Sequence, residues 1–311
     1  MAALSRLSTS GAFVVDENKT AVSLRGATVI GFDTVAAGED IPTVLSLDET
    51  NISLMRDVWG LNLVRIPFLA QSVLSGNGAV AAVDLLAGLD AAISIVSQAG
   101  LYVLLAMSAP AAATGTAPSP DASATQAWQT LAARYKGNNA VLYELFASTA
   151  PLDPTWPQEA AMLIGTIRRE AQAALIFVGG GKGGSDVSQL PLLFPTCDPI
   201  FNIVYTTDVS TATDPPDSGP LSALAECYPV FASTWSEPDD GRIGPYIADI
   251  FGRYGIGFAA ANWNAAPNLI VDAANHDFTA TAWGLVASRA AAAPVRPMRQ
   301  PFSYATAGRG R

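Results

Sequence analysis

The sequence predicts a single-domain (β/α)8 TIM barrel of the α/β class. Short β-rich runs alternate with helical stretches along the chain, and these runs are continuously apolar rather than alternating, as in strands buried on both faces. Eight such runs are present, and eight parallel strands covered by helices close into a barrel. The 311 residues suit one barrel of about 250 residues with additions at its ends. Binding or chemistry is then expected at the carboxyl ends of the strands.

The strands and helices are expected in strict alternation. Each helical stretch follows a strand, and a long loop precedes the first helix. The expected strands are 22–28, 63–67, 102–107, 141–146, 174–178, 200–205, 230–233 and 257–261. The expected helices are 51–59, 85–99, 123–136, 158–173, 220–227, 246–254 and 279–292.

The two ends of the chain add to the barrel. Residues 1–21 form an N-terminal hairpin region, with a hairpin-like segment over 11–24, and the barrel spans 22–293. Residues 294–311 form an irregular tail that carries Arg296, Arg299, Arg309 and Arg311. Such a terminal extension is typically solvated.

Composition excludes several classes of protein. A hydrophobic fraction of 50% excludes a disordered chain, and every apolar run is too short to cross a bilayer. A formal net charge of −10 argues against DNA or RNA as partners. The first residues lack the apolar core of a secretory signal, so a native start predicts a cytoplasmic protein.

Cysteine and histidine are too scarce for a metal site. Only Cys197, Cys227 and His276 are present, so no metal or cofactor is expected and His276 is given no catalytic role. The two cysteines are expected to be reduced and structural, with a disulfide as the alternative.

Seven segments, taken in order, resemble the cellulase-like family 5 glycoside hydrolases, whose fold is this same barrel. GAFVVDENKTAVSLRGATVIGFD is similar to the opening hairpin and first strand, GLNLVRIPF to the second and GLYVLLAMS to the third. The others, AWQTLAARYKGNNAVLYELF, NIVYTTDVS, YPVFASTWS and GFAAANWNAAPNLI, match the fourth, sixth, seventh and eighth strand regions. The resemblance implies that Arg65 stands where the family keeps an active-site arginine.

The departures from the family indicate a pseudoenzyme. Retaining glycosidases need two carboxyl groups about 5 Å apart. The stretch 146–151, which should carry the acid/base glutamate, has no carboxylate, and Thr234 stands where the nucleophile should be. The family's supporting His, Tyr and Trp positions hold Ser108, Asp208, Ser210 and Ala261. Glu237 or Asp239 as surrogate acids are the alternative, which would leave a residual hydrolase.

Two loops carry candidate ligand-binding residues. Gly181, Lys182 and Gly183 follow the fifth strand, where glycine amides and a lysine suit an anion. Asp208, Asp214 and Asp217 follow the sixth strand and suit a guanine edge. A flexible barrel loop and solvated turn residues are the respective alternatives.

Four further candidates complete the expected site. Arg242 precedes an expected helix start and suits a phosphate, while pairing with Asp239 or Asp240 is its alternative. Trp235 and Trp263 are expected as stacking faces near the mouth, with plain packing as the alternative for Trp263. The buried Arg65 is expected to pair with Asp208 or with a ligand phosphate.

These features predict a non-catalytic barrel that binds a small anion. An acidic, alanine-rich barrel without export signal also resembles a barrel protein that binds cyclic di-GMP and ppGpp, so the sequence predicts a second-messenger sensor that signals to an unknown downstream protein. The alternatives are a carbohydrate-binding pseudoglycosidase and a residual glycoside hydrolase.

Overall fold

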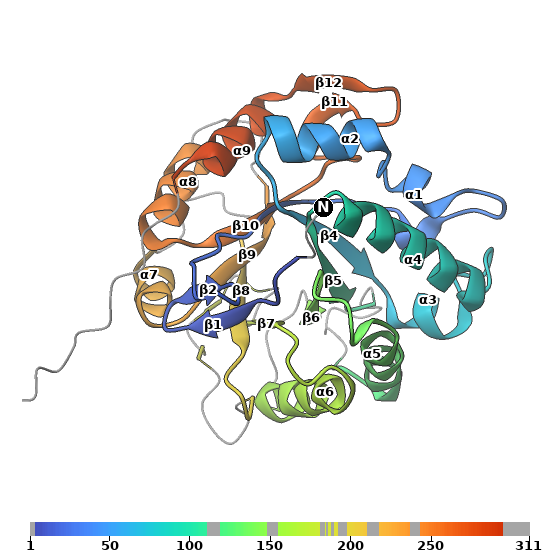
Figure 1. The fold of residues 1–311 in the computed structure, drawn as a ribbon, viewed down its shortest axis with the longest axis horizontal. Helices are drawn as coiled ribbons and strands as arrows, with labels where there is room; N and C mark the ends of the chain where they lie inside the picture. The colour runs from blue at the N-terminus through green and yellow to red at the C-terminus, as the bar shows by residue number, and fades with distance from the viewer. Residues whose placement is uncertain are drawn as a thin grey trace, which may run out of the picture.

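The structure is a computed structural model that describes residues 4–110, 119–147, 155–180, 184, 186–187, 190–191, 198–209, 218–236 and 243–294. Eight parallel strands close into a barrel in the order β10-β3-β4-β5-β6-β7-β8-β9. The helices form a ring around these strands (Figure 1). The predicted (β/α)8 fold is confirmed.

All eight predicted strands are present, with bounds that differ from the prediction by at most three residues. Their apolar runs bury both faces, as parallel strands inside a helical shell require. The strands are β3 (Arg25–Thr28), β4 (Leu63–Phe68), β5 (Tyr102–Ser108), β6 (Val141–Ala147), β7 (Ile176–Gly179), β8 (Ile203–Asp208), β9 (Val230–Trp235) and β10 (Gly257–Ala260).

Seven predicted helical regions are also present. Side chains of Asp48, Asp121 and Thr281 cap the first amides of α2, α5 and α9, which explains where these helices begin. The helices are α1 (Ile41–Val44), α2 (Glu49–Ser53), α3 (Ala70–Ser75), α4 (Ala82–Gln98), α5 (Ala122–Tyr135), α6 (Trp156–Glu170), α7 (Ser218–Cys227), α8 (Ile243–Tyr254) and α9 (Ala282–Ala292), with a short 3-10 turn η1 (Phe32–Thr34) and a π turn η2 (Leu54–Val58) that continues α2.

Three details differ from the prediction. The short helices α1 and α3 were not expected from the sequence. Residues 279–280, expected in the last helix, belong to β12 (Asp277–Ala280), which pairs with β11 (Ile270–Asp272) in an antiparallel hairpin. Exposed and half-buried residues alternate along β12, which is typical of a half-exposed strand. The strand is too short, and too close to the last helix, for this alternation to be recognised in the sequence.

Apolar side chains fill the barrel at the end where the strands begin. Along β4, Leu63 belongs to an inner cluster while Val64 and Ile66 face the helices, so Arg65 faces inward. The inner cluster comprises Leu7, Leu24, Leu63, Tyr102, Leu104, Leu142, Leu175, Phe177, Val204, Phe231 and Ala259.

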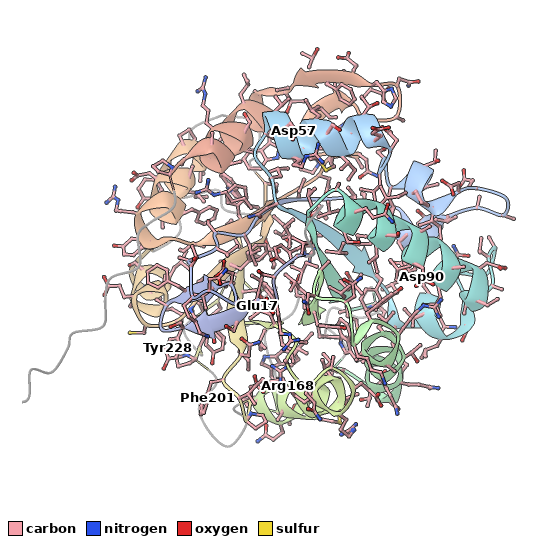
Figure 2. The ribbon with its side chains drawn as sticks, viewed as in Figure 1. Glu17, Asp57, Asp90, Arg168, Phe201 and Tyr228 are labelled. Atoms are coloured by element: carbon pink, nitrogen blue, oxygen red, sulfur yellow. The ribbon has the colours of Figure 1, made fainter. Side chains whose placement is uncertain are left out.

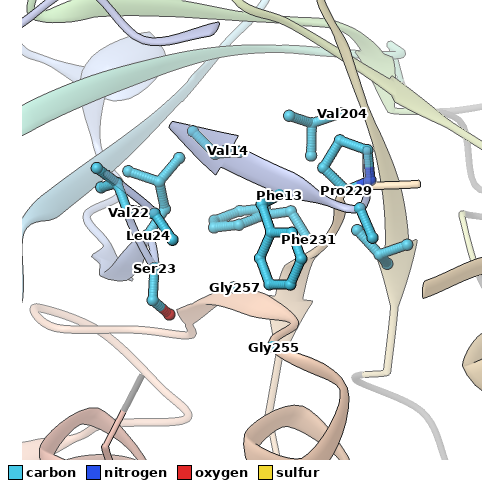
Figure 3. Close-up of a pocket in the computed structure, with 13 residues that line it drawn as sticks. Phe13, Val14, Val22, Ser23, Leu24, Val204, Pro229, Phe231, Gly255 and Gly257 are labelled. Carbon is cyan, nitrogen blue, oxygen red and sulfur yellow. The ribbon is translucent and has the colours of Figure 1, made fainter. Parts of the chain in front are cut away.

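An N-terminal hairpin closes that same end. Strands β1 (Ser8–Ser10) and β2 (Phe13–Val15) pair antiparallel, so the hairpin begins earlier than the predicted 11–24 segment. Phe13 and Val14 lie against Leu24 and Phe231 (Figure 3), around a cavity of about 20 Å³. This space holds about one water molecule. The hairpin therefore acts as a plug, and a ligand that enters the barrel interior must come from the opposite end.

Among the described helices, none has both the length and the apolar character that crossing a bilayer demands. The cytoplasmic location stays a prediction. Cys227 is a free, exposed thiol rather than the structural residue expected, and Cys197 lies outside the described residues.

Candidate functional site

The carboxyl ends of the strands form a mouth lined by small side chains. On β8, Val204 belongs to the inner cluster, so Thr206 and Asp208 face inward as well. A Cβ added to Gly179 on β7 would lie 3.1 Å from Thr206 Oγ1, which places Gly179 on the same inner face. By the same alternation from Leu104, Ser108 faces inward at the end of β5. The inner faces of β5, β7 and β8 therefore carry a glycine, hydroxyl groups and one carboxylate at this end of the barrel.

A β-bulge in β9 sets which residue reaches this mouth. Thr207 pairs with Ala232 but Asp208 pairs with Thr234, so one extra residue, Ser233, is inserted in β9. The bulge rotates the strand so that Thr234 shares the inner face with Asp208. The position that the family resemblance assigns to the nucleophile therefore lies at the inner mouth and holds a threonine.

The same bulge turns Trp235 outward. Its ring is fully buried and meets Phe251, Phe258 and Trp283 edge-to-face, with ring centroids 5.0, 4.9 and 4.7 Å away. The prediction of Trp235 as a stacking face for a ligand is wrong, because simple alternation from Phe231 would point it inward and the bulge reverses that direction.

Trp263 is buried behind the mouth rather than exposed in it. Its Nε1 donates a hydrogen bond of 2.7 Å to Oδ1 of Asn51, and its ring packs edge-to-face on Trp59 at 5.2 Å. The prediction of Trp263 as a ligand-stacking residue is therefore wrong, and its alternative of plain packing is confirmed.

Arg65 is paired with Glu144, on the second strand along from its own. Nε of Arg65 lies 2.7 Å from Oε2 and Nη2 lies 3.2 Å from Oε1, and both side chains are buried. The predicted partner Asp208 is wrong, because Glu144 holds the guanidinium of Arg65. The sequence signal for Glu144 is a charged residue at an inward position of the apolar run VLYELF, which is costly without a buried partner.

Asp33 is a mouth carboxylate that the sequence reasoning missed. It follows β3, and its Oδ1 accepts a hydrogen bond of 3.0 Å from the amide of Leu69, just past β4. Burial raises the pKa of Asp33, and the hydrogen bonds from Leu69 and Ser72 only partly offset this. A carboxyl group with a raised pKa keeps its proton more readily and is a candidate for acid chemistry or for binding.

Gly184, which follows β7 in the chain, packs against Asp208. A Cβ added to Gly184, whose φ is +88°, would lie 3.1 Å from the amide nitrogen of Asp208, so only glycine fits there without displacing β8. The predicted residues Gly181, Lys182, Gly183, Asp214, Asp217 and Arg242 lie outside the described residues, as do Ser210, Glu237, Asp239 and residues 148–151.

Comparison with known proteins finds a family whose model matches this chain. Residues 15–218 match the model of the family described as cellulase (glycosyl hydrolase family 5). No curated protein matches the chain.

Solved glucanases share the fold of the chain. A β-glucanase from Saccharophagus degradans, solved in its native form and with cellotetraose, has a TM-score of 0.74 in each case, at 18% and 19% identity over 94% of both chains. The Thermobifida fusca endoglucanase catalytic domain with cellotetraose has a TM-score of 0.72 at 17% identity, over 92% of this chain and 97% of that one. The major endoglucanase of Xanthomonas campestris pv. campestris has a TM-score of 0.69 at 17% identity, over 92% and 99%.

These matches overturn the prediction of a nucleotide sensor. The matched family and the similar structures are cellulases and glucanases, which point to carbohydrate rather than to cyclic di-GMP or ppGpp. The expected signalling role and downstream protein rested on that prediction. The two carbohydrate alternatives fit the matches better.

Proposed function

Because the chain belongs to the cellulase family, glycosyl hydrolase family 5, we propose that it is a carbohydrate-binding member that does not hydrolyse its ligand. The ligand class is a β-linked glucan oligosaccharide. Two of the similar glucanase structures contain cellotetraose, which makes it the first probe to try. The binding site is the mouth at the carboxyl ends of the barrel strands, where TIM barrels hold their ligands.

The observation that carries the proposal is the Arg65–Glu144 pair together with Thr234. A retaining mechanism needs two carboxyl groups about 5 Å apart, one to protonate the leaving oxygen and one to attack the sugar. Glu144 is buried and both of its oxygens bind Arg65, so its carboxylate serves the arginine below the mouth rather than a sugar. Thr234 has no carboxylate to offer at the position of the nucleophile. This arrangement supports binding without the double displacement.

The rest of the inner mouth supports sugar binding. Ser108 and Thr234 are partly exposed and carry hydroxyl groups that both donate and accept hydrogen bonds, as sugar hydroxyls do. Asp208 is partly exposed at the strand end and its carboxylate accepts from sugar hydroxyls.

A residual glycoside hydrolase is the second candidate, and Asp33 favours it. A carboxyl group with a raised pKa is what a general acid needs, and Asp33 lies at the same end of the barrel as Asp208. The surrogate acids Glu237 and Asp239 stay predictions. Cleavage of an activated aryl cellobioside that is lost in Asp33→Asn would favour this candidate over pure binding.

Titration calorimetry with cellotetraose tests the binding proposal. Ser108→Trp fills the mouth and should lower the affinity at least about tenfold, which corresponds to about 1.4 kcal/mol. Gln129→Trp adds the same ring on the exposed side of α5 and should leave the affinity unchanged. Absence of cellotetraose binding in the wild type, or equal losses in both variants, contradicts the proposal.

Loss of binding in Trp263→Ala would carry no weight as a ligand test. Trp263 is a fully buried core residue, and removing such a ring costs about 3–5 kcal/mol of folding free energy.

Hydrolysis is measured in parallel with an aryl cellobioside. Turnover by the wild type at rates typical of enzymes, about 1 s⁻¹ or faster, would overturn the non-hydrolytic part of the proposal.

A further inference from the structure

A pocket of about 310 Å³ opens at the opposite end of the barrel from the mouth. It lies between the ends of α5 and α6 and the starts of β6 and β7, and residues 6 and 7 form one wall. Its volume falls at the lower limit of small-molecule sites. Besides two tyrosines, the polar side chains in its lining are Arg6, Lys136, Asn138, Asn139, Glu170 and Gln172.

The wall that carries Arg6 is fixed on both sides. The carbonyl of Leu4 accepts a hydrogen bond of 3.3 Å from Nδ2 of Asn139. The carbonyl of Ser5 accepts one of 2.9 Å from the hydroxyl of Tyr102, and Leu7 is buried in the inner cluster. The backbone of Arg6 is therefore held in place before any ligand arrives, which lowers the entropy cost of binding.

The charged side chains that line this pocket are available to a ligand. Among the described residues, the side chains of Arg6, Lys136 and Glu170 make no hydrogen bond or ion pair. Nearby cations on the same two helices are paired: Arg134 of α5 with Asp90, and Arg168 of α6 with Asp198. The pocket thus keeps two cations and one carboxylate available to a ligand.

Two helix ends determine what kind of anion fits. Both α5, ending at Tyr135, and α6, ending at Glu170, point their carboxyl ends at this pocket. The last carbonyls of a helix have no partner within it and carry partial negative charge, so they accept hydrogen bonds and disfavour a bare anion. A ligand must therefore bring hydroxyl donors as well as negative charge.

We propose that this pocket binds a small anionic sugar, a single ring that bears one carboxylate or phosphate group. Arg6 and Lys136 bind the anionic group, because charged donors give the stronger hydrogen bonds to it. Glu170, Gln172 and the helix-end carbonyls bind the ring hydroxyls. The site is separate from the mouth, and it does not depend on whether the mouth binds glucan.

Calorimetric titration of the full chain with four probes tests the ligand class. Glucuronate and glucose 6-phosphate represent the two sources of negative charge. Glucose has the sugar ring without the charge, and inorganic phosphate has the charge without the ring. We expect glucuronate or glucose 6-phosphate to bind at least about tenfold more tightly than glucose and than phosphate. The tighter of the two identifies the source. The proposal is overturned if neither glucuronate nor glucose 6-phosphate binds more tightly than both glucose and inorganic phosphate.

Three pocket variants and one control locate the site. Arg6→Gln and Lys136→Gln should each weaken binding about tenfold, and Glu170→Gln should weaken it less. Arg289→Gln removes the same charge from the exposed side of α9 and should change the affinity by less than about twofold.

Arg6→Gln and Lys136→Gln should have the same free energy of unfolding as the wild type, because both side chains are exposed. Their affinity for cellotetraose should be unchanged, so failure of this site and failure of the mouth are told apart. An equal loss of the anionic sugar in Arg289→Gln would show general charge attraction and overturn the proposed site.

Discussion

Two buried arginine–carboxylate pairs hold different parts of the barrel, and they are built differently. Arg65–Glu144 crosses the barrel interior below the mouth, and among the described residues each side chain has only the other as hydrogen-bond partner. Arg168–Asp198 lies at the opposite end, where Arg168 also donates 2.6 Å to the carbonyl of Ala174 and Asp198 accepts 2.7 Å from the amide of Asn202. Arg168 is labelled in Figure 2.

The two pairs therefore differ in what they stabilise. Arg65 and Glu144 bind only each other among the described residues, whereas Arg168 and Asp198 also bind the backbone of a turn. Arg168 and Asp198 fix the turn before β8, where Phe201 has a φ of +55° and an exposed fraction of 73% (Figure 2). A bulky residue in that conformation needs surrounding contacts to hold it. Arg65 and Glu144 hold no loop, so their cost of burial is offset only by their own attraction.

The largest expected effect is that of Asp198→Ala. This change leaves Arg168 without its carboxylate and releases the turn, so the free energy of unfolding should fall by about 5 kcal/mol. Denaturant unfolding measures it. Asp249→Ala, which breaks the exposed pair with Arg253, should cost less than about 1 kcal/mol. A loss below 2 kcal/mol in Asp198→Ala would mean that the turn holds itself.

Glu144→Ala should lower the free energy of unfolding by about 3 kcal/mol, because it leaves the buried guanidinium of Arg65 without a partner. Glu144→Gln keeps an acceptor for Nε of Arg65 and should cost less. Both values come from the same denaturant experiment. An unchanged stability in Glu144→Ala would show that water reaches Arg65 from the mouth.

Replacing both members of each pair sharpens the comparison. Arg65→Met with Glu144→Leu should lie within about 2 kcal/mol of the wild type, because an apolar pair avoids the cost of burying charge. Arg168→Met with Asp198→Leu should still be destabilised by more than that, since the carbonyl of Ala174 and the amide of Asn202 lose their partners. Equal effects in the two double variants would remove the distinction drawn between the pairs.

The smallest expected effect concerns Asp33, a half-buried carboxylate whose described partners are neutral. Its pKa is raised mainly by burial, so the folded state favours the protonated form. That stabilisation is present below the unfolded pKa of about 4 and is lost as the pH rises through the folded pKa. Asp33→Asn should therefore be slightly more stable than the wild type at pH 7, and this advantage should vanish in acid. Thermal unfolding between pH 3 and pH 7 checks it, and a constant difference would contradict it.

The barrel was predictable because the signal for each strand is local. Continuous apolar runs separated by helical stretches identify parallel strands without knowledge of their partners, and all eight were found within three residues. The hairpin β11–β12 was missed because a short half-exposed strand next to a helix has too few residues to show its period.

The site was harder to predict because its geometry is not local. The direction of Trp235 depends on the single extra residue Ser233, which no alternation pattern reveals. Trp263 is buried, and the hydrogen bond that fixes its ring goes to Asn51, 212 positions away in the chain. Glu144 lies 79 positions from Arg65, so their pairing appears only when the barrel closes. Packing across the fold, rather than residue type, decided each of these cases.

The barrel end closed by the hairpin also receives both ends of the described chain. Ser5 is bound to Tyr102, the first residue of β5, and the carbonyl of Ala291 accepts a hydrogen bond from Arg25, the first residue of β3. Coupling the protein to a bead or sensor chip through residue 4 or residue 294 would hold it with the mouth turned toward the bulk solution. Oligosaccharide could then reach the mouth freely, while the 310 Å³ pocket would face the support.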